Sequence, residues 1–180
     1  MIYLFDLDGT LTNSEEGILK AFHYTFEKMG IKDVSDNILR NYIGPPLDET
    51  FRREFNLYND ENDKAMHFFR EYYKEKGKYE NIPYAGIKEL LENLSIDIIE
   101  YFKLDYFTKI AGATKDSSRT KKYDIIEYAL KSLKVEDRSK VYMIGDRFTD
   151  INGARRAGIN SIGVLWGFGS REELEDCKAD

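Results

Sequence analysis

The sequence lacks the features that would place the protein outside the cell or in a membrane. Cys177 is the single cysteine among 180 residues, which excludes an internal disulfide framework and is typical of a reducing compartment. No apolar run approaches the ~20 residues that a transmembrane helix needs. The apolar start Met1–Phe5 meets Asp6 at once and is too short for a signal peptide. We therefore expect a cytoplasmic protein with no membrane partner.

An excess of positive charge is also missing. The chain has 27 Lys and Arg against 33 Asp and Glu, a formal net charge of −6, and this balance argues against a nucleic acid polymer as partner. With 42% hydrophobic and 33% charged residues, the composition is that of a folded protein and not of a disordered one. A chain of 180 residues forms one domain, or a core with one modest insertion, and needs no disulfide or metal to fold.

Apolar runs that alternate with amphipathic segments predict an α/β fold. Four runs have the length and composition of buried strands: Ile2–Phe5, Phe107–Ala111, Val141–Ile144 and Ser161–Leu165. Helical patterns accompany the later runs: Ile87–Leu94, Ile96–Phe102, Thr120–Leu133, Thr149–Ala157 and Arg171–Cys177. Strands that alternate with helices form a parallel sheet with helices on both faces, and ligands bind at the carboxyl ends of its strands.

The stretch from residue 18 to 79 has no strand pattern. Its first helix follows Asn13 and Ser14, which are typical helix N-caps, and ends at Gly30. Three further helices are predicted: Ser35–Ile43, Leu47–Phe55 and Asn62–Lys76. We therefore expect an all-helical unit over residues 15–81, inserted into an α/β core that residues 1–14 and 82–180 form.

Four aspartates follow two of the predicted strands. Asp6 and Asp8 come directly after the first strand, and Asp146 and Asp150 come after Val141–Ile144. One Asp after a strand is usually a turn or helix-cap residue, but four carboxylates at one sheet edge repel each other unless a cation neutralises them. Ligands that offer only oxygen select a hard cation, and the sequence therefore predicts a Mg²⁺ site.

For two polar residues near these aspartates, the sequence pattern does not distinguish a functional role from a structural one. Lys122 begins a helix whose apolar stripe includes Ile126, so it falls on the face toward the sheet, where a cation could neutralise a phosphate. From spacing alone, a solvated surface lysine beside Arg119 and Lys121 is the more frequent outcome. Thr10 could donate its hydroxyl to a phosphate or cap the next helix. Neither a G-x-G-x-x-G nor a Walker A loop occurs.

These residues match a known family. Asp6-Leu7-Asp8-Gly9-Thr10 resembles the first motif of haloacid dehalogenase superfamily phosphatases, and Gly145-Asp146-Arg147-Phe148-Thr149-Asp150 resembles the fourth. Lys122, in Lys-Tyr-Asp-Ile-Ile, resembles the third motif. The helical insertion is similar to the small α-helical cap of the phosphoglycolate phosphatase-like branch, and Ile43–Leu47 and Trp166–Gly169 are similar to that branch in detail. The resemblance covers nearly the whole chain, and this order of motifs is highly specific.

The resemblance implies a Rossmann-like core with a helical cap over residues 15–81, and a Mg²⁺-dependent hydrolase of phosphate monoesters. The substrate would be a small phosphorylated metabolite such as phosphoglycolate, a nucleoside monophosphate or a sugar phosphate. Asp6 would attack the phosphorus and form an aspartyl-phosphate. Asp8 would protonate the leaving alcohol and then activate water, and Lys122 would stabilise the extra phosphoryl charge.

The resemblance also assigns the other site residues. Mg²⁺ would be held by Asp6, the main-chain carbonyl of Asp8 and Asp146, with Asp150 as a further ligand or behind the ligands. The phosphate-binding residues would be Gly9, Thr10 and Lys122. The residues that set substrate choice from the cap would be Arg40, Gly44 and Pro45.

One family motif has no match. The second motif is a Ser or Thr at the end of a strand beside the first one, after the helix that corresponds to Ile87–Leu94. Here Leu94 runs directly into Ser95, with no apolar strand between them. Either the written sequence omits a stretch at this point, or the chain is truly shortened by about one strand of the sheet.

Two other functions stay open. A phosphomutase of the same family shares Asp6 and Asp8, and would return an isomerised ester instead of free phosphate. A catalytically weak phosphate-binding or regulatory module is compatible with the missing second motif.

Overall fold

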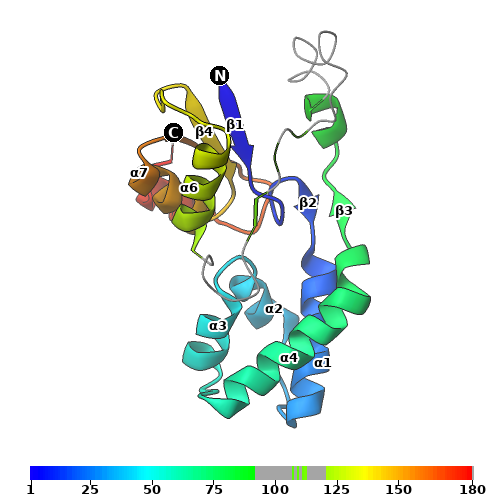
Figure 1. Cartoon of the computed structure of the whole chain (residues 1–180). Coiled ribbons are helices and arrows are strands. Elements are labelled where there is room, and N and C mark those ends of the chain that lie inside the picture. Colours follow the sequence, from blue (N-terminus) through cyan, green and yellow to red (C-terminus); the bar gives the residue numbers. More distant parts are fainter. Residues whose placement is uncertain (92–106, 108, 110, 113–120, 180) are drawn as a thin grey trace.

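Among the residues that the structure describes, three parallel strands form the main sheet, at whose edge the predicted site lies; Figure 1 shows the place of this sheet beside the helical segment. The computed structural model describes residues 1–91, 107, 109, 111–112 and 121–179. Its main sheet contains β1 (Ile2–Phe5), β4 (Val141–Gly145) and β5 (Asn160–Gly163), in the order β1-β4-β5. β4 is the central strand and pairs in parallel with both neighbours. The predicted α/β fold with a parallel sheet is confirmed.

Helices connect these strands. α6 (Lys122–Ser132) leads into β4, α7 (Phe148–Ala157) connects β4 to β5, and α8 (Arg171–Asp176) follows β5. Because parallel neighbours cannot be joined by a tight turn, the chain must return along the sheet in a crossover helix. The three helices agree within two residues at each end with the predicted Thr120–Leu133, Thr149–Ala157 and Arg171–Cys177.

The core of the α/β part lies between α6, α7 and β4. Ile126 and Leu130 of α6 pack with Val141 of β4 and Ala154 of α7, and all four are at most 2% exposed. Burial of a side chain of the size of Ile or Leu contributes roughly 1.5–3 kcal/mol. Residues four apart share one helix face, so this packing also turns Lys122, four residues before Ile126, toward the sheet.

The inserted segment is helical. Its helices and 3₁₀ turns are α1 (Glu15–Met29), α2 (Asp36–Leu39), η1 (Arg40–Tyr42), α3 (Leu47–Glu54), α4 (Asp60–Glu75) and η2 (Gly77–Tyr79). α1 ends at Gly30 in the left-handed conformation, as the sequence predicts. The single helix predicted over Ser35–Ile43 is instead α2 followed by a 3₁₀ turn. Pro45 and Pro46 prevent its continuation, and the last turn tightens.

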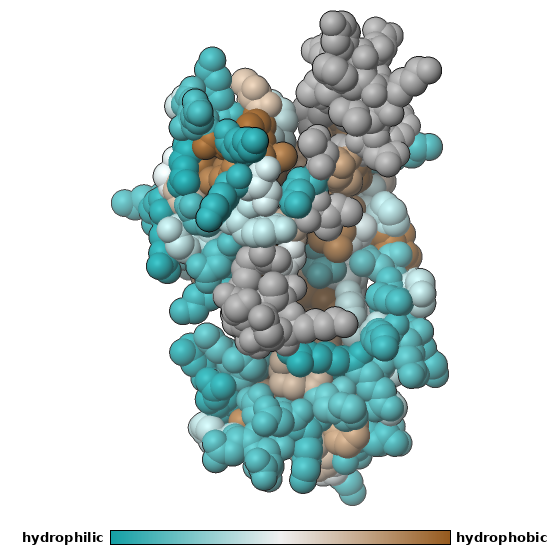
Figure 2. Space-filling model, in the orientation of Figure 1, coloured by the Kyte–Doolittle hydropathy of each residue, from teal (hydrophilic) through white to brown (hydrophobic). Residues whose placement is uncertain are grey.

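An aromatic cluster holds the helical segment together. The ring of Phe22 in α1 is fully buried and lies 5.7 Å from the ring of Phe51 in α3 and 5.1 Å from that of Phe69 in α4, both nearly edge to face. Such pairs add about 0.5–1.5 kcal/mol to the burial itself. The outer face of this segment in Figure 2 is largely hydrophilic, so its apolar residues are gathered inside.

A short antiparallel pair joins the helical segment to the sheet. β2 (Thr12–Asn13) and β3 (Ile82–Pro83) pair at the two places where the chain enters and leaves the helices. Figure 1 shows both at the junction between the helices and the α/β part. These strands have two residues each, which is too short for a recognisable alternation of polar and apolar residues.

Some predictions lie outside the described residues. The Leu94–Ser95 junction, the helix Ile96–Phe102 and the end of the helix Ile87–Leu94 belong to this group. Of the predicted strand Phe107–Ala111, residues 107, 109 and 111 are described, and none of the three lies in a strand. Among the described helices, none is long and apolar enough to cross a lipid bilayer.

The division into residues 15–81 and an α/β core stays a prediction, and two substitutions test it. Phe22→Ala and Leu130→Ala each remove a buried side chain from a different core and should lower the free energy of unfolding by roughly 2–5 kcal/mol. If the segments fold as separate units, each variant shifts a different transition in urea unfolding followed by circular dichroism.

Tyr79→Ala is the control, since that ring is 75% exposed and should shift neither transition. A single transition that moves equally in both core variants would contradict the division.

Candidate active site

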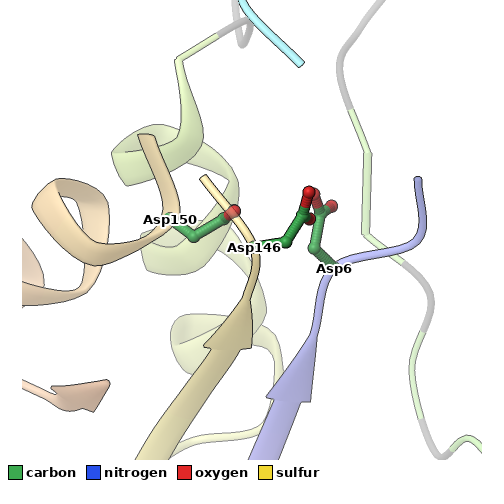
Figure 3. A group of neighbouring side chains, drawn as sticks. All are labelled: Asp6, Asp146 and Asp150. Carbon is green, nitrogen blue, oxygen red and sulfur yellow. The ribbon is translucent and has the colours of Figure 1, made fainter. Parts of the chain in front are cut away.

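The site begins where two neighbouring strands end. Asp6 follows β1 and Asp146 follows β4, and the Asp6 N–H donates to Ile144 at 2.9 Å. Because the strands are parallel and in register, their carboxyl ends lie at the same edge. Figure 3 shows the two carboxylates side by side at this edge.

Asp150 joins them from the first turn of α7. Its side chain is fully buried, and its Oδ2 accepts from the main-chain N–H of Arg147 at 3.1 Å. A carboxylate is favoured there by the unpaired N–H groups at the start of a helix. Oxygen atoms of Asp6, Asp146 and Asp150 all lie within 4.8 Å of one another. In Figure 3 the side chain of Asp150 points toward the other two.

Lys122 lies against two of these carboxylates. Its Nζ is 2.7 Å from Asp6 Oδ1 and 2.8 Å from Asp150 Oδ1, and its side chain is 19% exposed. The prediction of a solvated surface lysine, which spacing alone favours, is therefore wrong, because the apolar stripe of α6 turns Lys122 inward. Burial opposes the charged form of Lys122, but the charges of Asp150 and Asp6 outweigh it and raise its pKa.

The carboxylates are crowded and poorly hydrated. Burial raises the pKa of Asp150, and the charge of Asp6 adds to this, whereas Lys122 opposes it. Burial also raises the pKa of Asp146, against hydrogen bonds from Phe168 and Thr10. Both shifts come mainly from burial, which disfavours the ionised form of each carboxyl, and the charge of Asp6 adds to them.

These residues fit a divalent cation. Three carboxylates and one ammonium leave two negative charges without a partner in the cluster. A divalent cation would neutralise them, and ligands that offer only oxygen suit a hard ion such as Mg²⁺. The carboxyl of Asp8 is not one of the three, so its predicted contact with a metal is through the main-chain carbonyl.

Both oxygens of Asp146 have hydrogen-bond donors. The Thr10 hydroxyl donates to Oδ1 and the Phe168 main-chain N–H donates to Oδ2, each at 2.9 Å. Gly9 has a φ of 84°, and a Cβ there would lie 2.3 Å from Asp146 Oδ2. Only glycine fits this position. The sequence did not indicate Phe168 as a donor, since a main-chain N–H has no residue signature.

The turn after β1 uses the groups predicted to bind phosphate. The Gly9 N–H donates to Thr12 at 2.8 Å, the Thr10 N–H donates to Leu7 at 3.3 Å, and the buried Thr10 hydroxyl donates to Asp146. These donors are engaged within the protein in this structure. Thr10 therefore orients a carboxylate here, and the phosphate-binding role of Gly9 and Thr10 stays a prediction.

Asp8 lies on the same turn but apart from the acidic cluster. Burial raises the pKa of its carboxyl, and the charge of Asp6 adds to this, while the Ser14 hydroxyl and Lys122 act against it. A carboxyl with a raised pKa holds its proton more readily near neutral pH. Asp6 and Asp8 therefore have different surroundings although they are two residues apart.

The predicted specificity residues lie in the helical segment. The Arg40 guanidinium donates to Glu15 at 2.6 Å and to Asn37 at 2.8 Å, both in the same segment. Gly44 lies against the side chain of Arg147, a residue that the sequence did not single out. The role of Arg40, Gly44 and Pro45 in substrate choice stays a prediction.

A family model and two named relatives identify the same protein family. The family model described as "Haloacid dehalogenase-like hydrolase" matches residues 3–164. The chain is 35% identical to a 5′-nucleotidase from Pseudomonas aeruginosa over 95% of this chain and 85% of that protein. It is 29% identical to a phosphoglycolate phosphatase from Aquifex aeolicus over 93% of this chain and 85% of that protein.

A solved structure agrees with these relatives. The crystal structure of a predicted phosphatase from Clostridium acetobutylicum superimposes with a TM-score of 0.89 and 38% identity, covering 99% of this chain and 90% of that one. The alignments with the nucleotidase and the phosphoglycolate phosphatase span 189 and 187 positions, more than the 180 residues of this chain. Both relatives therefore contain residues within the matched region that this chain lacks, and the missing strand after Leu94 stays a prediction.

Thr10→Val tests the hydrogen bond to Asp146. The substitution keeps the shape of the side chain but leaves a buried carboxylate without one of its donors. We expect the free energy of unfolding, measured in urea, to fall by about 1–3 kcal/mol.

Thr12→Val is the matched control, because its hydroxyl makes only a longer 3.3 Å contact with the Leu7 carbonyl near the surface. Its effect should stay within about 0.5 kcal/mol, and equal losses in the two variants would contradict the role of Thr10.

Proposed function

Because the chain belongs to the haloacid dehalogenase-like hydrolase family, we propose that it hydrolyses phosphate monoesters of small metabolites in a Mg²⁺-dependent reaction. The observation that carries this proposal is the position of Lys122 between Asp6 and Asp150, with Asp146 beside them. This arrangement supports the proposal, because Asp6 would act as the nucleophile beside the charge of Lys122, and the carboxylates would serve as metal ligands.

In the first step, Asp6 attacks the phosphorus. A bond forms between a carboxylate oxygen of Asp6 and phosphorus while the bond from phosphorus to the ester oxygen breaks. The leaving oxygen takes the proton of the Asp8 carboxyl and departs as an alcohol. The raised pKa of Asp8 supports this role, since burial makes its protonated form more available.

In the second step, water attacks the phosphorus of the aspartyl-phosphate. The ionised Asp8 takes a proton from this water, a new bond forms from oxygen to phosphorus, and the bond to Asp6 breaks. Inorganic phosphate leaves, and both aspartates return to their starting states. Lys122 holds a positive charge beside the reacting oxygen throughout, where it stabilises the developing negative charge.

The metal site would consist of Asp6, Asp146 and Asp150, with the main-chain carbonyl of Asp8 implied by the resemblance. A bound divalent cation would supply positive charge to the phosphoryl oxygens. The chain's own part is to hold its ligands: Thr10 and the Phe168 N–H orient Asp146, and the Arg147 N–H orients Asp150. These supports keep three like charges close together before a cation arrives.

The size of the neighbouring pocket supports a small substrate. A pocket of about 290 Å³ lies beside Lys122 and is lined by Gly44 and Pro46 of the helical segment and by Phe148 and Asn152 of α7. This volume is just below that of typical ligand pockets. Lys122 is the residue of the proposed catalytic set that lines the pocket, and the four aspartates lie outside it. The relatives named 5′-nucleotidase and phosphoglycolate phosphatase support substrates of this class, with the loop around Gly44 contributing to substrate choice.

Asp6→Asn tests the proposed nucleophile. With p-nitrophenyl phosphate, wild type should release phosphate only with Mg²⁺, and Asp6→Asn should lose at least about 10³-fold in kcat. Asp60→Asn, at the exposed start of α4, is the control and should keep the wild-type rate.

Equal, metal-independent rates in wild type and Asp6→Asn would refute the hydrolase and favour a phosphate-binding module. Return of an isomerised ester without free phosphate would instead favour the phosphomutase.

Asp8→Asn separates the two steps. p-Nitrophenolate leaves without help from an acid, so the variant should still form the aspartyl-phosphate but hydrolyse it slowly. We expect a rapid burst of about one nitrophenolate per active site in stopped-flow absorbance. An alkyl phosphate, whose leaving group needs the proton, should give no burst. The absence of a burst with both substrates would contradict the assignment of Asp8.

A further inference from the structure

Arg147 contacts three separate parts of the molecule although it follows Asp146 directly. Its guanidinium Nη1 donates to the main-chain carbonyl of Ile43 in the helical segment, and its Nε donates to Glu173 in α8 at 2.9 Å. Its main-chain N–H donates to Asp150 at 3.1 Å. The residue is only 7% exposed, and its contacts with Ile43 and Asp150 are buried, whereas that with Glu173 is partly exposed.

The loop of residues 43–46 sits closely on this side chain. Gly44 has a φ of 105°, and a Cβ on it would lie 3.0 Å from Cγ of Arg147. Any larger residue at position 44 would strain the loop and push it from the arginine. The contact between the loop and Arg147 therefore includes the aliphatic part of the side chain as well as the guanidinium.

Glu173 fixes the other side of Arg147. One carboxylate oxygen accepts from Arg147 Nε at 2.9 Å and from the Phe148 main-chain N–H at 2.8 Å. The carboxylate balances the guanidinium charge and also binds the start of α7. Movement of the arginine therefore moves the backbone that carries Asp150.

We propose that Arg147 is a positioning residue that couples the seating of loop 43–46 to the geometry of the acidic cluster. The side chain of Arg147 donates a hydrogen bond to the loop, and its main-chain N–H donates one to Asp150. When the loop leaves, a buried guanidinium donor loses its acceptor, and the support of Asp150 loosens. The inference rests on the proposed function, because it links the loop beside the substrate pocket to the residues that would hold Mg²⁺.

The test measures Mg²⁺ binding by calorimetry, with turnover of p-nitrophenyl phosphate recorded in parallel. Gly44→Ala unseats the loop from the helical side, and Arg147→Gln removes the guanidinium. Each should weaken Mg²⁺ binding by about 10-fold, as loss of a support behind metal ligands does. The double variant should bind Mg²⁺ no more weakly than Arg147→Gln alone, because both changes break one contact.

Two matched controls separate this role from general destabilisation. Gly30→Ala places the same strain at a glycine with a φ of 71° that has no neighbour within 4 Å. Arg138→Gln removes an arginine that binds Glu127 and the Ala157 carbonyl within the α/β part. Both should lower the melting temperature and leave Mg²⁺ affinity unchanged, and Arg147→Lys should restore part of the affinity that Arg147→Gln loses.

Wild-type affinity in Gly44→Ala, or losses that multiply fully in the double variant, would overturn the coupling. If Gly44→Ala does not fold, the comparison of Arg147→Lys with Arg147→Gln decides, and equal losses there contradict the proposal. Failure of wild type to bind Mg²⁺ or to turn over substrate would refute the proposed function itself. Wild-type turnover with unaffected variants would refute the coupling alone.

Discussion

A single ammonium group joins three of the elements that carry the site. Lys122 belongs to α6, and its Nζ lies within 2.8 Å of Asp6 after β1 and of Asp150 in α7. A charge buried to this extent is stable only with partners, and each of the two carboxylates still compensates it if the other is removed. The packing of α6 on the sheet and the ion pairs of Lys122 therefore fix the same helix position.

Other groups of the site reduce the repulsion among the carboxylates that the single charge of Lys122 does not neutralise. Three carboxylates share the edge, and burial raises the pKa of Asp146 and Asp150. Hydrogen bonds from Thr10 and Phe168 to Asp146, and from the Arg147 backbone to Asp150, partly stabilise these carboxylates. In the proposed function, the remaining loss of stability at this edge would be offset by binding of a cation and a phosphate, a common relation between stability and activity.

Much of this arrangement could be predicted from sequence. Apolar runs that end in aspartate placed Asp6 and Asp146 at one edge, because parallel strands align their carboxyl ends. The direction of Lys122 could be predicted only in part. The apolar stripe through Ile126 indicates the face toward the sheet, whereas the neighbouring Arg119 and Lys121 favour a surface lysine, and the packing of α6 decides between the two. The hydrogen bond from Thr10 to Asp146 and the contact from Arg147 to Ile43 join residues that are more than 100 positions apart. Such pairs depend on the folded topology and have no local signature.

The pairing of β2 with β3 has a consequence for how such a chain varies. Antiparallel partners lie about 5 Å apart, so Asn13 and Ile82 are neighbours in space although the whole helical segment separates them in sequence. An insertion whose two ends meet can grow, shrink or be exchanged without displacing the strands that carry the aspartates. If residues 15–81 fold as the separate unit that the sequence predicts, this junction would let that unit be exchanged while the strand ends that carry Asp6 and Asp146 stay in place.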